Sequence, residues 1–249
     1  ELRERERRLR MIAERIDQGI FLAVPDFSEA FYVNEAYENI WGRPVEDLLD
    51  NPKGFIEYID PRDREEFESK FDRMIAEIEA GEAEDRYEFT YRIQRPDGDI
   101  RWVRAVGYPL EEEPGELRFI GIIEDITERR ELERTYRSVF ENVSDGLVVH
   151  DPDTGKILDV NERFCEMNGY DRESLIGETI DMVTSANHAY EDVLDYIKTA
   201  RREEPQLFEW ENERSDGSVF PVEVHLSVVT IHGNERVLAS VRDISERKR

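Results

Sequence analysis

The sequence predicts an α+β fold in two tandem copies, each a five-stranded antiparallel sheet with helices on one face, the two joined by a helix. The first observation is an internal repeat, because Val-Asn-Glu-Ala-Tyr at positions 33–37 returns as Val-Asn-Glu-Arg-Phe at 160–164. The second is that both copies follow one order of strand, turn, strand, helices and hairpin strands. The third is size, because about 120 residues suffice for a whole domain and exceed a solenoid repeat.

Each element follows from a local pattern. Apolar runs at 20–24 and 147–149 predict a first strand that ends in a turn rich in Asp, Pro and Gly. Apolar residues at helical spacing predict a long helix over 62–80 and its counterpart over 190–199. Alternating apolar residues predict a half-buried strand over 87–93, and an Asp-Gly pair predicts the hairpin turn after it. The remaining predicted strands are 100–108, 118–124, 208–213, 219–229 and 236–242.

Amphipathic stretches lead into both copies, so we place the domains at 1–127 and 128–249, each beginning with a helix. In the second stretch the apolar residues have the a/d spacing of a coiled coil: Leu132, Tyr136, Val139 and Val143. The N-terminal stripe is formed by Leu2, Leu9, Ile12 and Ile16. The spacing favours a homodimer through these helices. In the alternative, each short stripe packs on its own domain.

The chain is strongly acidic, with 60 acidic and 34 basic residues and a formal net charge of −26. Nucleic acid and anionic membranes are disfavoured as partners, because both are polyanions. Lysine is scarce among the basic residues. Acid-rich, lysine-poor composition is typical of halophilic proteins, since the Debye length falls to about 3 Å at 1 M salt and carboxylate repulsion is screened. An acidic mesophilic protein from a GC-rich genome is the alternative.

The cysteine count and the length of the apolar stretches indicate where in the cell the segment resides. A single cysteine, Cys165, excludes an internal disulfide framework and fits a reducing cytoplasm. The apolar stretch at 20–24 is far shorter than the roughly 20 residues that a spanning helix needs. We therefore expect a cytoplasmic segment, cut from a longer protein, that makes no membrane contact of its own.

A series of motifs recurs in the same order in both copies. Val-Asn-Glu-x-aromatic precedes a short helix and a glycine, a charged Asp-Gly hairpin follows, and each copy closes on Asp-Ile-Thr-Glu-Arg at 125–129 or Asp-Ile-Ser-Glu-Arg at 243–247. This series resembles the PAS sensor domain with its C-terminal PAC motif, in tandem as in sensor histidine kinases of haloarchaeal type. The resemblance implies that each sheet curls around a small pocket and that flanking helices pass a signal on.

The closing motif has a physical interpretation as well. Strand gives way to helix there, and Thr127 and Ser245 are suited to accept hydrogen bonds from the first free N–H groups of the next helix. Asp125 and Asp243 are placed to bond back to the domain, so we interpret all four as caps that relay the signal. The candidate lining of the implied pockets is Tyr37, Trp41, Phe89, Tyr91, Trp102, Phe164, Met167 and Trp210. Simple core packing is the alternative role for these side chains.

Catalytic motifs are absent from the sequence, which has no Gly-rich phosphate loop, no paired cysteines and no nucleophile elbow. We therefore expect no enzyme activity and no metal site in this segment. Covalent flavin is unexpected, because Cys165 lies upstream of the position used by flavin-binding relatives and reads as a buried apolar residue. Haem is unexpected too, because His188 precedes the middle helix and is expected to be exposed to solvent. The cofactor is left open.

These patterns together predict a sensory module. It would relay a ligand, redox or partner signal through connecting helices to an output domain outside the chain, most simply a histidine kinase of a two-component system. Two alternatives stay open: a non-sensing scaffold for dimerisation or docking, and the sensor region of a transcriptional regulator. A small-molecule ligand is compatible with the first function but is not required by the others.

Overall fold

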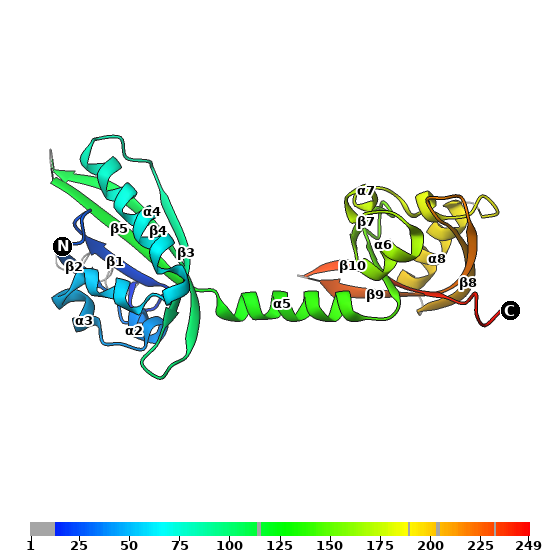
Figure 1. Ribbon diagram of the computed structural model, residues 1–249, viewed down its shortest axis with the longest axis horizontal. Helices are drawn as coiled ribbons and strands as arrows, with labels where there is room; N and C mark the ends of the chain where they lie inside the picture. Colours follow the sequence, from blue (N-terminus) through cyan, green and yellow to red (C-terminus); the bar gives the residue numbers. More distant parts are fainter. Residues whose placement is uncertain (1–12, 114–115, 189, 203–204, 232) are drawn as a thin grey trace. The chain divides into compact units, whose positions relative to one another are not determined.

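The computed structural model describes residues 13–113, 116–188, 190–202, 205–231 and 233–249. The chain divides into two compact units, with Glu133 and Arg134 on either side of the division. Each unit holds a five-stranded antiparallel sheet with helices (Figure 1), so the predicted α+β class with paired copies is confirmed. The predicted stripe of Leu2, Leu9 and Ile12 lies outside the described residues, and the predicted boundary after residue 127 stays a prediction.

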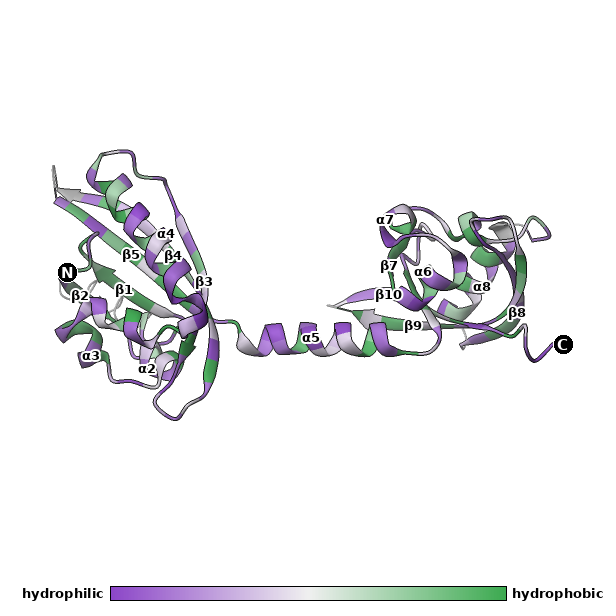
Figure 2. Ribbon diagram, in the orientation of Figure 1, coloured by the Kyte–Doolittle hydropathy of each residue, from purple (hydrophilic) through white to green (hydrophobic). Residues whose placement is uncertain are grey.

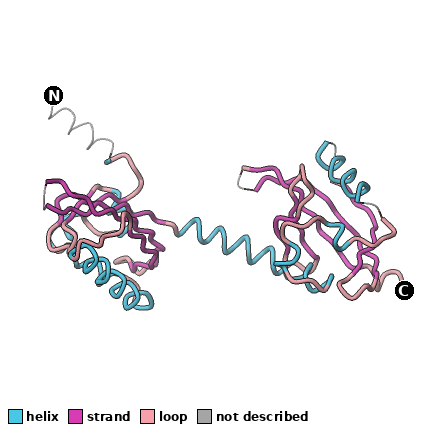
Figure 3. The backbone as a smooth tube through the Cα atoms, turned by 90° about the horizontal axis from the view of Figure 1, so that it is seen from above, coloured by secondary structure: helices cyan, strands magenta, loops and turns pink. Residues whose placement is uncertain are grey.

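The first unit has its strands in the spatial order β2-β1-β5-β4-β3. Figure 3 shows these strands in one layer and the long helix α4 in another. The strand β4 is longer than predicted, because its pairing with β5 continues beyond Tyr108. The elements are β1 Gly19–Ala23, β2 Ala30–Val33, α2 Ala36–Trp41, α3 Val45–Asp50, the 3₁₀ helix η1 Pro52–Tyr58, α4 Pro61–Glu79, β3 Tyr87–Gln94, β4 Ile100–Glu113 and β5 Glu116–Asp125.

The second unit repeats this plan with the strand order β7-β6-β10-β9-β8. The chain enters it through α5, Thr127–Asn142, whose first turns belong to the first unit. The other elements are β6 Gly146–His150, β7 Ile157–Val160, α6 Glu162–Asn168, α7 Arg172–Leu175, the 3₁₀ helix η2 Ile180–Val183, α8 Tyr190–Arg202, β8 Gln206–Glu213, β9 Val219–Ile231 and β10 Asn234–Asp243. No described helix has both the length and the apolar character that crossing a bilayer requires.

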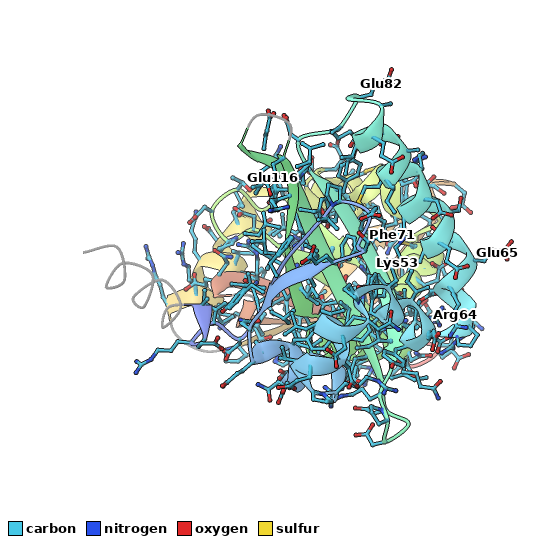
Figure 4. All side chains as sticks on the ribbon, turned by 90° about the vertical axis from the view of Figure 1, so that its left-hand side faces the viewer. Lys53, Arg64, Glu65, Phe71, Glu82 and Glu116 are labelled. Atoms are coloured by element: carbon cyan, nitrogen blue, oxygen red, sulfur yellow. The ribbon has the colours of Figure 1, made fainter. Side chains whose placement is uncertain are left out.

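Helix α4 forms where its sequence supplies both a cap and an apolar stripe. The Asp60 carboxylate accepts a hydrogen bond from the Arg62 N–H at 3.0 Å, and Pro61 occupies the first helical position, where a missing N–H costs nothing. Four side chains then face the sheet at helical spacing: Phe67, Phe71, Met74 and Ile78. Figure 4 shows Phe71 inside the first unit, whereas Glu65 and Glu82 project from its rim. Burying each large apolar side chain contributes about 1.5–3 kcal/mol.

Two glycines on paired strands make room for aromatic rings on the inner face of the first sheet. Gly107 of β4 and Gly121 of β5 are register partners. A Cβ at Gly107 would lie 2.1 Å from the Phe119 ring, and a Cβ at Gly121 would lie 2.1 Å from the Phe21 ring. The rings of Phe21 and Phe119 therefore lie directly against backbone, with their centroids 6.3 Å apart. This close contact fixes the wall of the interior that α4 covers.

Replacing Gly121 with alanine should destabilise the first unit by about 1–3 kcal/mol, because the added methyl group would overlap the Phe21 ring. The measurement is urea unfolding of the whole chain, followed by tryptophan fluorescence. Gly19→Ala is the matched control, since its Cβ would lie 3.3 Å from the Ile123 Cβ and needs only a small adjustment. Equal unfolding midpoints for the two variants would contradict this packing.

Candidate functional site

The first unit encloses a small apolar cavity between α2, α4 and the sheet. Its volume is about 40 Å³, and aromatic side chains make up much of its lining. Four of the predicted lining residues are there: Tyr37 and Trp41 from α2, and Phe89 and Tyr91 from β3. The alternation of β3 had indicated the inward direction of the last two, and the structure agrees.

Trp102 does not line this cavity but lines a separate hollow together with Phe89 and Tyr91. Side chains alternate along β4, so the fully buried Val103 points inward and Trp102 lies on the other side of the sheet. There its ring is covered by the guanidinium of Arg130 from α5 at 3.9 Å and lies 5.1 Å from that of Arg92. Trp102 thus belongs to the contact between β4 and the exit helix.

The polar atoms within the first cavity are neutral. Burial raises the pKa of the Tyr37 and Tyr91 phenols well above the ordinary value, so both keep their protons at neutral pH. The indole N–H of Trp41 has no hydrogen-bond partner, although only 1% of the residue is exposed. A buried donor without an acceptor is uncommon and marks the position where a hydrogen-bonding ligand atom would gain most.

The second unit has its own cavity of about 40 Å³. Phe164 and Trp210 line it as predicted, whereas Met167 does not. Met167 is buried against β6 instead, next to the Gly146 backbone. His150 lines this cavity, a role that its place at the end of a predicted strand had not indicated. Burial lowers the pKa of its imidazole to about 4, so the ring is neutral at physiological pH.

Cys165 and His188, the two residues considered for flavin and haem binding, are packed in the second unit. Cys165 is buried, as expected, and burial raises the pKa of its thiol. His188 was expected to be exposed, but it is only partly so, because its ring stacks on Trp210 with centroids 3.7 Å apart. The described residues bring together no group of three His, Cys, Asp or Glu side chains that could hold a metal ion.

The first exit junction joins β4 and β5 to the start of α5 by three hydrogen bonds. The Ile126 N–H donates to the Trp102 carbonyl at 2.8 Å, and the Trp102 N–H donates to the Thr127 hydroxyl at 2.8 Å. The Thr127 N–H donates to the Asp125 carboxylate at 2.9 Å. Asp125 also lies 3.4 Å from a guanidinium nitrogen of Arg101 on β4. These bonds tie the helix start to the sheet.

The roles within this junction are therefore divided differently from the sequence-based assignment. The carboxylate of Asp125, rather than the hydroxyl of Thr127, caps a free N–H group at the helix start. The hydroxyl of Thr127 instead accepts from the sheet and substitutes for a strand partner. Asp125 bonds back to the domain, as expected, through Arg101.

The second exit junction keeps the aspartate and loses the hydroxyl bond. The Ser245 N–H donates to the Asp243 carboxylate at 2.8 Å, and the Ile244 N–H donates to the Pro221 carbonyl at 3.1 Å. Pro221 stands where the first copy has Trp102, and proline has no N–H to donate to a hydroxyl. The Asp243 carboxylate thus takes the N–H that follows, and residues 245–248 form a turn in place of the helix start expected from the sequence.

Entry junctions, where the segment before each sheet meets its first strand, had not been foreseen. Asn161 is fully buried, and its carboxamide oxygen accepts from the N–H groups of Leu147 and Phe164 at 2.8 and 3.0 Å. Its nitrogen donates to the carbonyls of Phe140 in α5 and Asp145 at 3.0 and 3.1 Å. All of its hydrogen-bonding groups are used, and asparagine directly before a helix was the sequence signal for such a cap.

The first copy repeats this arrangement. The carboxamide of Asn34 accepts from the Ile20 N–H at 2.7 Å and donates to the Ala13 and Gln18 carbonyls at 2.8 and 3.0 Å. A glutamate adds a second bond in both copies, since Glu14 and Glu141 accept from the first N–H after the asparagine. The buried asparagine is therefore the fixed link between the first strand of each sheet and the segment before it, which in the second copy is α5.

Comparison with known proteins assigns both copies to one fold. A family model described as the PAS fold matches residues 30–123, and a family model described as the PAS domain matches residues 144–246. The chain is 26% identical over 120 residues to the methyl sulfide methyltransferase-associated sensor of Methanosarcina acetivorans. That match covers 48% of this chain but only 12% of the sensor's length.

Solved structures similar to one half of the chain include two sensory domains. The PAS domain of an HTR-like protein from Haloarcula marismortui is 37% identical, covers 46% of this chain and 99% of that one, and has a TM-score of 0.42. A domain of a sensory box sensor histidine kinase/response regulator from Geobacter sulfurreducens is 22% identical, with 47% and 99% coverage and a TM-score of 0.39.

Replacing Thr127 with valine should destabilise the first unit by about 1–3 kcal/mol, because the Trp102 N–H loses the hydroxyl that accepts from it. Thr127→Ser keeps the acceptor and should retain most of the stability. The measurement is the free energy of unfolding of the whole chain in urea.

The second copy supplies the control for this prediction. Ser245→Ala should change the free energy of unfolding by about 0.5 kcal/mol or less, because Pro221 offers no N–H to the hydroxyl. A Ser245→Ala variant as destabilised as Thr127→Val would show that the hydroxyls act in some other way.

Proposed function

Because the chain belongs to the PAS family and carries two of its domains in tandem, we propose that it relays a ligand, redox or partner signal through α5 to an output domain outside this chain. The output domain is a histidine kinase in this proposal. The segment itself is non-catalytic and acts by moving its neighbours. Its similarity to a sensor from Methanosarcina acetivorans supports the sensory role.

The observation that carries the proposal is that α5 is hydrogen-bonded at each end, to β4 at its start and to the buried Asn161 near its end. Thr127 accepts from β4 at the start of the helix, and Asn161 donates to Phe140 near its end. A change in the first sheet therefore acts on the helix that leads into the second unit. Such a relay requires two states, and the input must bind them with different affinity to shift the balance.

A halophilic source, a cytoplasmic location and the lack of a nucleic-acid partner belong to the same proposal. The acidic, lysine-poor composition supports a halophilic source, for which the melting temperature should rise steeply from dilute buffer to molar potassium chloride. The single, buried cysteine supports a cytoplasmic location, and the net charge of −26 argues against a nucleic-acid partner.

A scaffold is the second candidate, and cavity size favours it. Both cavities measure only about 40 Å³, so the cores are nearly filled by the chain itself. A scaffold would hold partners together without a change in α5. The two functions differ in how the output responds when the hydrogen bonds of the exit junction are removed, because only a relay needs these bonds.

Removing the hydrogen bonds of the exit junction should uncouple the output from the signal. In the full-length protein, Asp125→Ala should reduce the signal-dependent change in output about tenfold or more, because the cap on α5 and the pair with Arg101 are both lost. Autophosphorylation is the measured output for a kinase. Asp99→Ala is the matched control, since Asp99 pairs with the same Arg101 but does not touch α5. An Asp125→Ala protein that responds like the wild type would favour the scaffold.

Helix α5 is also the proposed dimer contact. Leu132 and Val139 are 64% and 62% exposed, and Tyr136 is 39% exposed on the same stripe. Figure 2 shows green, hydrophobic bands among the purple, hydrophilic residues of α5. Isolated exposed apolar side chains are ordinary, but a stripe with a/d spacing on one helix fits a second copy of itself.

Charges on this stripe should dissociate the dimer. Sedimentation equilibrium of the chain should give twice the monomer mass for the wild type and the monomer mass for Leu132→Glu with Val139→Glu, because both charges would be buried in the contact. Leu158→Glu changes a leucine that is 39% exposed on β7 and should leave the dimer intact. A monomeric wild-type chain would rule out this contact.

A further inference from the structure

Phe27 lies in the turn between β1 and β2 on a backbone conformation that suits glycine. Its φ is +54°, and it is the one non-glycine residue with positive φ among the described residues. Bulky side chains rarely adopt this region. The turn of the second copy is closed by the equivalent hydrogen bond, from the Asp151 N–H to the Lys156 carbonyl, but its positive φ of +69° falls at Gly155, one position later than Phe27. The first copy thus places phenylalanine, and not glycine, at the positive-φ position of its turn.

The ring of Phe27 fills the interior of the first unit. Phe27 is only 6% exposed, and its ring lines the first cavity. Four other rings surround it, with centroid distances of 5.4 Å to Phe21, 5.9 Å to Phe55, 5.1 Å to Phe71 and 5.7 Å to Phe119. These rings come from β1, η1, α4 and β5, so the Phe27 ring is a shared contact of the sheet and its covering helices.

The space that remains is too small for an aromatic guest. The first cavity measures about 40 Å³ with Phe27 in place, whereas a dry protein cavity that takes up benzene measures about 150 Å³. A phenyl ring is itself the size of benzene, so removing it would supply the missing volume. The lining contains no charged side chain, which disfavours a charged guest, and the Trp41 N–H is an unused donor.

We propose that Phe27 is a built-in occupant of the first cavity, and that a small neutral aromatic molecule binds there by displacing its ring. A guest with one hydrogen-bond acceptor, such as an aromatic ketone, would also satisfy Trp41. As a sensing step this exchange rests on the proposed function, while the binding itself does not. The turn that would move follows β1, and β1 pairs with β5, which ends at the exit residue Asp125.

The test is calorimetric titration of the full chain with toluene and acetophenone. Phe27→Gly and Phe27→Leu should bind toluene at least tenfold more tightly than the wild type, because the wild type must first displace a ring. Phe31→Leu makes the same change at a phenylalanine that is 40% exposed on β2 and should bind like the wild type. Acetophenone should bind Phe27→Gly more tightly than toluene does, and Trp41→Phe added to that variant should abolish the difference.

The wild-type chain provides a measurement that needs no variant. Its Phe27 amide and ring resonances should shift on saturation with toluene more than those of Phe31. The proposal is overturned if neither Phe27 variant gains affinity, or if toluene binds the wild type while the Phe27 resonances stay unchanged. Toluene could also displace the Phe27 ring in the full-length protein without changing its output. That result would leave this inference standing and refute the sensory function alone.

Discussion

The hydrogen bonds at the two ends of α5 are the constraint on which the rest of the structure depends. The first N–H groups and the last carbonyls of a helix have no partners within the helix, and burial beside a sheet makes an unmet group costly. Here Asp125 caps the start while Thr127 bonds to β4, and Asn161 takes up a carbonyl near the end. The same bonds that complete the helix also join it to β4 in the first unit and to Asn161 in the second, so the helix cannot shift without disturbing them.

The two copies share a fold and differ where function would be set. Pro221 cannot make the hydrogen bond that Trp102 makes in the first copy. The second exit junction therefore depends on the hydrogen bond to Asp243. Thr154 stands at the position that matches Phe27, so the second cavity has no counterpart of the Phe27 ring. Duplication fixes the sheet, the turns and the entry asparagine, while single substitutions change what each interior holds and how firmly each exit is tied.

Much of this was predictable, because periodicity reports which face of an element is buried. The alternation on β3 correctly placed Phe89 and Tyr91 inward, and helical spacing located α4 almost to the residue. Trp102 lies outside the first cavity because it stands next to the inward-pointing Val103 on β4, and aromatic character alone does not reveal which face of a strand a residue occupies. The cap moved from Thr127 to Asp125, which also bonds back to the domain as predicted, because several polar groups compete for one helix start. The significance of Phe27 lies in a backbone angle, which no pattern in the sequence indicates.

Amide hydrogen exchange along α5 tests the central claim most directly. In the full chain, Thr127→Val should speed exchange not only in the first turn but also in the part of α5 after Arg134 and at the Leu147 amide, which donates to Asn161. That result would show that the bond to β4 and the bonds of the entry asparagine act on one continuous element. Faster exchange confined to the first turn, with the Leu147 amide unchanged, would contradict it.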